Sequence, residues 1–398
     1  MAKPAAKLFS MLTPKRRWAQ FSVATMMIVV TVLCVWLALR GSEAQRKQEA
    51  IAAALNETTD IDFTDQPFDG VIAYLKAKHK IEIELDDKAL ADAGIGKNVV
   101  VTRYIKGITL RSALDQLLRD LDLTFNTRGG ALFITTTSEA KKILLSIRYP
   151  ITPPLYRPES PGSENELIDA IRSTIEPASW DESGGPGTIR FLPPKRCLVI
   201  EQTQQVHREI ARLLGMLAEP ESPPQQSASV RAIAAALDEQ TNLDFTDLPV
   251  WDLVESLKAK SDIEIQIDFK SFDEAGIDGS TTVTYQVNGV ALRSALKELL
   301  DELDLTTIVR DETLVIITKT EADQVLDTRV YPIAPHLHDA QSPQSADELI
   351  DHVVATIVPD SWEHLDGRGT IRFFPPTNCL IVSQSEKVHD ELRKRLSP

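Results

Sequence analysis

The feature that most constrains this chain is an internal repeat. Its closing stretch, "GTIRFFPPTNCLIVSQSEKVHDELRKRL" (Gly369–Leu396), nearly matches "GTIRFLPPKRCLVIEQTQQVHREIARLL" (Gly187–Leu214), which lies 182 positions earlier. The same offset separates "IDFTD" at Ile61 from "LDFTD" at Leu243, and the two copies of "LRSAL" and of "YPI" also keep it. Because this register holds without a gap, the sequence predicts tandem duplication of one complete structural unit.

Charge is unevenly distributed along the 398 residues. Residues 1–40 hold six basic and no acidic side chains, so the rest has 37 basic and 58 acidic ones, a net charge of −21. An acidic body of this kind repels phosphate backbones, which argues against nucleic-acid binding. The 43% apolar and 25% charged content is typical of globular domains.

An apolar segment near the N-terminus predicts a membrane anchor. Trp18–Leu39 is an uncharged run of 22 residues, and a helix of that length spans about 33 Å, enough for a hydrocarbon core. Lys15, Arg16 and Arg17 precede it, so residues 1–17 are expected in the cytoplasm and the body across the membrane. The alternative is a cleaved signal peptide, but "WLALRGSEA" is a poor cleavage site and the apolar run is long for one.

The first half of each unit predicts the order β-α-β-β-α-β-β. In copy 1, "IEIEL" (residues 81–85) alternates like a strand with one buried face, and Asp65 and Pro67 mark the start of the helix before it. A second helix carries a leucine-rich stripe over Leu110–Leu121. "LTFNTRGGALFITT" then predicts a hairpin that turns at Gly129-Gly130.

The second half predicts a β-α-β-β-α module. A strand at Ile147–Ile151 precedes an amphipathic helix, a Gly-rich loop at Gly184–Gly187, a hairpin and a final helix. We therefore expect an α+β chain with one N-terminal transmembrane helix. Its expected parts are a tail (1–17), the membrane helix (18–39), a juxtamembrane helix (40–59), the first half and module of copy 1 (60–140 and 141–218), a linker (219–229), and the first half and module of copy 2 (230–322 and 323–398).

These motifs resemble a known family. "FTDQP", "LRSALDQLLRDLDLTF" and "LFITT" are similar to the STN domain (secretin and TonB N-terminus) of bacterial envelope proteins. "YPI" followed by "NCLIV" resembles the short, KH-like secretin N-terminal module, although copy 1 has Arg196 where the family and copy 2 (Asn378) have asparagine. The secretin pore domain has no counterpart in this chain.

Together with the apolar run Trp18–Leu39, the resemblance predicts a single-pass protein of the bacterial inner membrane with its body in the periplasm, and in this it differs from secretin pores, which lie in the outer membrane. It implies an interaction scaffold for envelope or secretion proteins, including homo-oligomers, with a part in secretion or envelope assembly. The alternative is an STN-type signalling adaptor between envelope components.

No residue pattern predicts an enzyme, a cofactor, a metal site or a small-molecule substrate. His207 and His389 occupy equivalent helix positions without a second histidine at HExxH spacing, and we expect them to be solvated or capping residues. His336 and His338 form a close pair in copy 2 alone, which argues against a metal site. The acidic pairs are expected to be solvated charges at helix ends; they are Asp120 with Asp122 and Asp301 with Asp304.

The tryptophans and cysteines have structural and functional interpretations. Trp180 and Trp362 are equivalent and each precedes the Gly-rich loop, where each either closes a small core, the interpretation we favour, or anchors a partner. Cys197 and Cys379 are also equivalent and are expected to be buried small hydrophobes, whereas Cys34 lies in the apolar N-terminal run.

Overall fold

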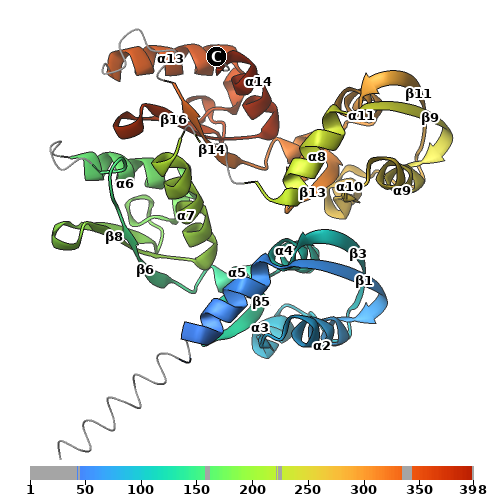
Figure 1. Cartoon of the computed structure of the whole chain (residues 1–398), viewed down its shortest axis with the longest axis horizontal. Helices are drawn as coiled ribbons and strands as arrows, with labels where there is room; N and C mark the ends of the chain where they lie inside the picture. The colour runs from blue at the N-terminus through green and yellow to red at the C-terminus, as the bar shows by residue number, and fades with distance from the viewer. Residues whose placement is uncertain are drawn as a thin grey trace, which may run out of the picture.

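The computed structural model describes residue 43 and residues 45–156, 162–220, 222, 226–333 and 343–396. Over these residues the protein is a mixed α+β structure with small sheets of two or three strands (Figure 1). None of the described helices is long and apolar enough to cross a membrane. Trp18–Leu39, the predicted membrane span, lies outside the described residues.

The first part of copy 1 combines a two-stranded ribbon and a three-stranded sheet. Its elements are a helix over residues 45–56, β1 (Thr58–Pro67), α2 (Phe68–His79), β2 (Ile83–Leu85), α3 (Asp87–Asp92), β3 (Val100–Thr109), α4 (Leu110–Arg119), β4 (Leu123–Arg128), β5 (Ala131–Thr136) and α5 (Thr137–Ala140). Strands β1 and β3 pair antiparallel, while the order β2-β5-β4 places β2 parallel and β4 antiparallel to β5.

The strands and helices predicted for this part are present in the predicted succession, but two short helices that were not predicted, α3 and α5, also occur. The hairpin turns at Gly129-Gly130 as expected, because both glycines adopt the positive φ that the turn requires. Asp65 does not cap α2, since the cap position is Pro67 and Asp65 itself has a φ of 51°. The prediction also lacked α3, whose start is capped by Asp86, the Oδ1 of which accepts a hydrogen bond from the Ala89 amide at 3.1 Å.

One hydrophobic core holds this part together. The leucine stripe of α4 faces inward, and the core extends to the helix over residues 45–56, which contributes Ile51, Ala54 and Leu55. The segment expected as a juxtamembrane helix therefore packs on the first part of copy 1 over its described residues.

The second part of copy 1 is a β-α-β-β-α module, in the predicted order. Its elements are β6 (Leu145–Pro150), α6 (Ser163–Thr174), the short 3₁₀ helices η1 (Pro177–Ser179), η2 (Asp181–Ser183) and η3 (Pro193–Lys195), β7 (Thr188–Leu192), β8 (Cys197–Gln202) and α7 (Gln204–Ala218). The sheet order is β6-β8-β7 with all neighbours antiparallel. Helices α6 and α7 bury their apolar stripes with one face of this sheet.

The same succession recurs in copy 2. Strand β9 (Gln240–Pro249), for example, begins 182 residues after β1. The other elements are α8 (Ala228–Asp238), α9 (Val250–Ser261), β10 (Ile265–Ile267), α10 (Phe269–Ala275), β11 (Thr282–Ala291), α11 (Leu292–Asp301), β12 (Leu305–Arg310), β13 (Thr313–Thr318), α12 (Lys319–Ala322), β14 (Asp327–Pro332), α13 (Pro343–Thr356), η5 (Pro359–Ser361), η6 (Glu363–Leu365), β15 (Thr370–Phe374), η7 (Pro375–Thr377), β16 (Cys379–Gln384) and α14 (Glu386–Leu396).

The first parts of the two copies also contact each other. The side-chain amide of Gln116 on α4 donates to the Asp311 carbonyl at 2.9 Å and to the Thr313 hydroxyl at 2.7 Å. The Thr109 amide, at the start of α4, donates to the Glu312 carboxylate at 2.6 Å. The turn between β12 and β13 therefore docks on α4 of copy 1.

Candidate interaction site

The most extensive contact between the two β-α-β-β-α modules is a helix-on-sheet interface. Helix α6 of copy 1 lies against β15 and β16 of copy 2, and α7 lies against β14 (Figure 1). Because side chains alternate across a strand, Leu380 and Val382 face the helices of their own module while Ile381 faces away from them. Ile381 and Phe374 are instead fully buried in the hydrophobic cluster of copy 1.

The equivalent sheet face of copy 1 is uncovered and more polar. Leu192 stands at the position of Phe374 and is 38% exposed, and Val199, at the position of Ile381, is half-buried. Exposed Arg148 takes the place of Val330, which packs against the cluster of copy 1. At these positions the covered face is thus apolar, while its uncovered counterpart has a charged or more exposed residue.

The helices differ between the copies in the same sense. Ala170 on α6 is buried, whereas its counterpart His352 on α13 is exposed. Leu167 is likewise fully buried, while its counterpart Leu349 is only partly buried. Each copy therefore has a helix face and an outer sheet face, but within the chain only the helices of copy 1 and the sheet of copy 2 meet.

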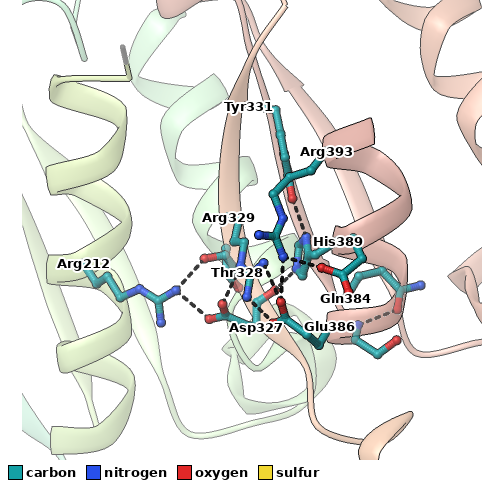
Figure 2. A network of polar contacts seen from close by, with 11 residues as sticks. Arg212, Asp327, Thr328, Arg329, Tyr331, Gln384, Glu386, His389 and Arg393 are labelled. Atoms are coloured by element: carbon teal, nitrogen blue, oxygen red, sulfur yellow. Dashed lines mark hydrogen bonds and ion pairs between the residues drawn. The ribbon is translucent and has the colours of Figure 1, made fainter. Parts of the chain in front are cut away.

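A chain of alternating charges lies at the edge of this interface (Figure 2). Arg212 of α7 contacts the Asp327 carboxylate at 2.5 Å and donates to the Thr328 carbonyl at 3.0 Å. Asp327 also accepts from Nε of Arg329 at 2.9 Å, and Arg329 forms a two-pronged pair with Glu386 of α14. The network therefore joins α7 of copy 1 to β14 and α14 of copy 2.

Burial and neighbouring charges set the ionisation of this network. Burial alone would raise the pKa of Asp327, but Arg212 and Arg329 together lower it below its ordinary value. Burial alone would lower the pKa of Arg329, but Glu386 and Asp327 raise it further above its ordinary value. Both groups are therefore charged at neutral pH and form ion pairs, Asp327 with Arg212 across the interface and Arg329 with Glu386.

Beside this network, His389 is a buried structural residue. Its Nε2 lies 2.7 Å from the Asp327 carbonyl oxygen and its Nδ1 lies 2.8 Å from the Tyr331 hydroxyl. Since a carbonyl can only accept, Nε2 carries the proton and Nδ1 accepts from the tyrosine. Burial is the main cause that lowers the pKa of His389 to about 4, so the ring is neutral.

His207 makes the equivalent contacts in copy 1. Its Nε2 lies 2.8 Å from the Leu145 carbonyl oxygen and its Nδ1 lies 3.0 Å from the Tyr149 hydroxyl, and burial lowers its pKa. The expectation that the two histidines are solvated or capping is wrong. Each instead fastens the last helix of its module to the Tyr-Pro strand, and the fixed spacing of tyrosine and histidine in both copies was the available sequence signal.

The charge network occurs in copy 2 and has no counterpart at the equivalent positions of copy 1. Leu145 stands at the position of Asp327, Ile147 at that of Arg329 and Gln204 at that of Glu386. Gln204 has a different contact, because its side-chain oxygen accepts from the Thr127 amide of the first part at 2.7 Å. The sequence offered a signal for the network, since charged residues replace two apolar residues and a glutamine at these repeat positions.

Both module tryptophans belong to the core. Trp180 and Trp362 are 1% exposed, and their indole nitrogens donate to the Ile175 and Ile357 carbonyls at 2.8 Å. The interpretation that they close small cores is confirmed, and neither offers a surface to a partner. The Gly-rich loop next to Trp180 packs so closely that a Cβ on Gly185 would lie 2.3 Å from a backbone atom of Ser179.

The remaining candidate residues are the cysteines, the pair His336 and His338, and the acidic pairs. Cys197 and Cys379 are buried, as expected, while Cys34, His336 and His338 lie outside the described residues. The acidic pairs lie at or just after the ends of α4 and α11; Asp120 pairs with Arg103, and Asp301 pairs with Lys319 at 2.7 Å. Within the described part of the chain, no group of three or more histidines, cysteines or carboxylates could hold a metal ion.

Comparison with known proteins finds similarity only to solved structures. No protein-family model matches the chain, and no curated protein matches it. Among solved structures, the match to a dimeric mutant of the N-terminal domain of the secretin XcpQ from Pseudomonas aeruginosa is 10% identical, covers 86% of this chain and 100% of that one, and has a TM-score of 0.16.

Two further matches are of the same kind. The GspC–GspD complex of the type II secretion system from enterotoxigenic Escherichia coli is 14% identical over 41% of this chain and 99% of that one, with a TM-score of 0.15. The type IV competence pilus secretin PilQ of V. cholerae is 17% identical over 39% of this chain and 37% of that one, with a TM-score of 0.16. All three matches are to a secretin or to a complex that contains one, at low sequence identity and low TM-score.

Proposed function

We propose that this chain is a membrane-anchored periplasmic scaffold that binds envelope or secretion proteins, including further copies of itself, through its β-α-β-β-α modules. The helix-on-sheet interface between the modules carries this proposal. It buries Phe374 and Ile381 inside one chain and leaves the equivalent sheet face of copy 1 and the equivalent helix face of copy 2 uncovered. A second chain that docks its α13 on β6-β8-β7 would repeat the same geometry.

Such an interface is heterologous, because two different surfaces meet, and repeated addition gives a ring or a filament. The uncovered surfaces carry Arg148 and His352 in place of apolar residues, so their association is expected to be weaker than the packing inside the chain. Anchoring through Trp18–Leu39 would favour it, since a membrane raises the local concentration of the modules. The division into an STN-like part and a secretin-like module in each copy belongs to the same proposal.

The test is the absolute mass of the full-length protein in detergent and of residues 41–398, measured by light scattering after size exclusion. We expect a discrete multimer of the full-length chain. A monomer in both forms would contradict self-assembly and would favour the second candidate, an STN-type signalling adaptor.

A further inference from the structure

The first part of copy 2 contains a hollow whose lining copy 1 lacks. It has a volume of about 300 Å³ and lies between the start of α9, helix α10 and the loop that follows it. Trp251, Phe269 and Phe272 supply its aromatic surface, and Asp273 and Asp278 supply carboxylates.

Two of these aromatic rings are exposed to solvent. Trp251 is 41% exposed and Phe269 is 44% exposed, and their ring centres lie 5.3 Å apart at an interplanar angle of 27°. The other two tryptophans in the described part of the chain, Trp180 and Trp362, are almost completely buried. Large aromatic surfaces that remain exposed are a common feature of binding sites.

A glycine makes room for the indole. A Cβ on Gly279 would lie 1.6 Å from the Cε2 of Trp251, so the ring lies directly on the backbone there. The amide of Trp251 donates to the Gly279 carbonyl at 3.3 Å. Any larger residue at position 279 would displace the indole from this place.

Copy 1 has the same backbone arrangement with different side chains. The amide of Asp69 donates to the Lys97 carbonyl at 3.1 Å, as Trp251 does to Gly279. Lys97 pairs with Asp87 at 2.8 Å. Copy 1 thus fills this place with an ion pair of its own, while copy 2 replaces Asp69, Asp87 and Lys97 with Trp251, Phe269 and Gly279.

The hollow is suited to a cation that the chain itself does not supply. Among the described residues, those that line it include two carboxylates and no lysine or arginine. Phe269 already accepts one cation on its ring, because the guanidinium carbon of Arg103 from copy 1 lies 5.5 Å from the ring centre. Phe269 therefore already has a guanidinium over its ring in this structure, and the hollow offers the adjoining indole and two carboxylates to a second one.

We propose that this hollow binds an arginine side chain presented by a partner protein. A guanidinium is flat and can pack on the solvent-exposed part of Trp251 while it donates to Asp273 and Asp278, which a lysine ammonium does less well. The site deepens the proposed scaffold function and rests on it for the nature of the partner. Arginine binding is tested by the fluorescence of Trp251, whereas self-assembly is tested by molecular mass. One proposal can therefore be contradicted while the other stands.

The experiment titrates the full-length protein in detergent with the capped peptide acetyl-Gly-Arg-Gly-amide and follows tryptophan fluorescence. We expect a saturable change from Trp251 with a dissociation constant on the order of 1 mM, since stacking and exposed ion pairs are individually weak. The matched probe is the same peptide with citrulline, which has nearly the same shape without the charge and should bind at least about tenfold more weakly.

The variants Trp251→Asp, Phe269→Asp and Gly279→Lys each introduce the residue that copy 1 carries on the same backbone, so the fold should accept them. Trp251→Asp should abolish the fluorescence response, and isothermal calorimetry should show that Phe269→Asp and Gly279→Lys lose arginine binding with an unchanged melting temperature. Equal binding of the citrulline peptide, or undiminished binding by these variants, would overturn the proposal. Binding of a chitin oligosaccharide in preference to the arginine peptide would also overturn it, because it would identify the aromatic pair as a sugar platform.

Discussion

At the scale of single residues, the most informative pair is tyrosine and histidine. In each module a buried histidine accepts from the tyrosine of the first strand and donates to a backbone carbonyl of the same strand. The rings stack at 5.8 Å in copy 1 and 5.9 Å in copy 2. Protonation would turn Nδ1 into a donor, so the tyrosine hydroxyl would have to accept instead of donate, and burial disfavours the charged ring.

His389 should therefore make stability depend on pH. Its pKa is about 4 in the folded protein and near its ordinary 6.5 when unfolded, so the unfolded state binds more protons between these values. Stability contributed by the neutral ring is present above pH 6.5 and falls as the pH drops toward 4, by about 3 kcal/mol in total. Chemical denaturation at a series of pH values measures it.

The control for this prediction is His389→Gln, which stays neutral throughout. Its stability should be lower at pH 7 than that of the unmodified protein, and its pH dependence between 6.5 and 4 should be flatter. Other groups, such as Asp390 with its raised pKa, titrate in both proteins and contribute equally to the pH dependence of stability. If the free energy of unfolding of the two proteins changes equally with pH in this range, His389 does not have this role.

Glycine positions give a second residue-scale prediction. Gly185→Ala should destabilise the module by about 1–3 kcal/mol, because its Cβ would meet the backbone of Ser179, which cannot move aside as a side chain could. Gly215→Ala is the matched control, since it lies within α7 with no atom within 4 Å of its Cβ. It should stabilise the protein by about 0.5–1 kcal/mol, and thermal unfolding of both variants measures the difference.

At the scale of elements, the two sheets of the modules differ in what covers them. Both have the same strand order and the same inner face, but β14-β16-β15 is covered on its outer face by α6 and α7 of copy 1. The outer face of β6-β8-β7 has charged residues at matching places, Arg148 for Val330 and Glu201 for Ser383. Side-chain chemistry on one sheet face therefore decides whether helices can pack there.

Exchange of these residues should separate the modules without unfolding them. The double variant Val330→Arg/Ser383→Glu gives the sheet of copy 2 the outer charges of copy 1, where the same module carries them. The interface should lose about 3 kcal/mol or more, because two charged side chains would have to leave water for the space under α6 and α7, which costs free energy even if they pair with each other. Small-angle scattering should show a larger radius of gyration with unchanged circular dichroism, and an unchanged radius would contradict the importance of this face.

At the scale of the whole molecule, the chain resembles a short array with two different ends. One end offers the polar sheet face of copy 1 and the other the exposed helix face of copy 2. Polar outer faces at the ends are what keeps repeat arrays soluble and limits their growth. The charge at Arg148 and Glu201 should therefore restrain association between chains.

The reverse exchange tests this restraint. Arg148→Val/Glu201→Ser makes the open sheet face of copy 1 like the covered face of copy 2, so chains should associate more strongly, by about tenfold or more for the burial of one additional apolar side chain. Sedimentation of residues 41–398 over a range of concentrations measures this. The control adds Leu349→Arg on the opposing helix face of copy 2 to this double variant. The triple variant should associate no more strongly than the unmodified protein. If it still associates strongly, the new apolar face associates nonspecifically.

Much of the local structure could be predicted from the sequence. Apolar periodicity located the leucine stripe of α4, the strand containing β2 and the glycine hairpin, because these patterns depend on contacts close in the chain. Comparison of the two copies also located the core, since Trp180 and Trp362 recur where each module closes. The short helix α3 was not predicted, because it has six residues and its start depends on one capping aspartate, Asp86, and not on an apolar periodicity.

The sequence by itself determined the order of elements, the repeat of 182 residues and the acidic charge of the body. Only the tertiary structure decided that His207 and His389 are buried, that Arg212 reaches Asp327 across the two modules, and that Trp251 lies on Gly279 beside Phe269. The physical reason is that periodicity reports which face of an element is apolar, but not which other element covers it. Residues brought together from distant positions acquire their pKa, partners and exposure only when the elements pack.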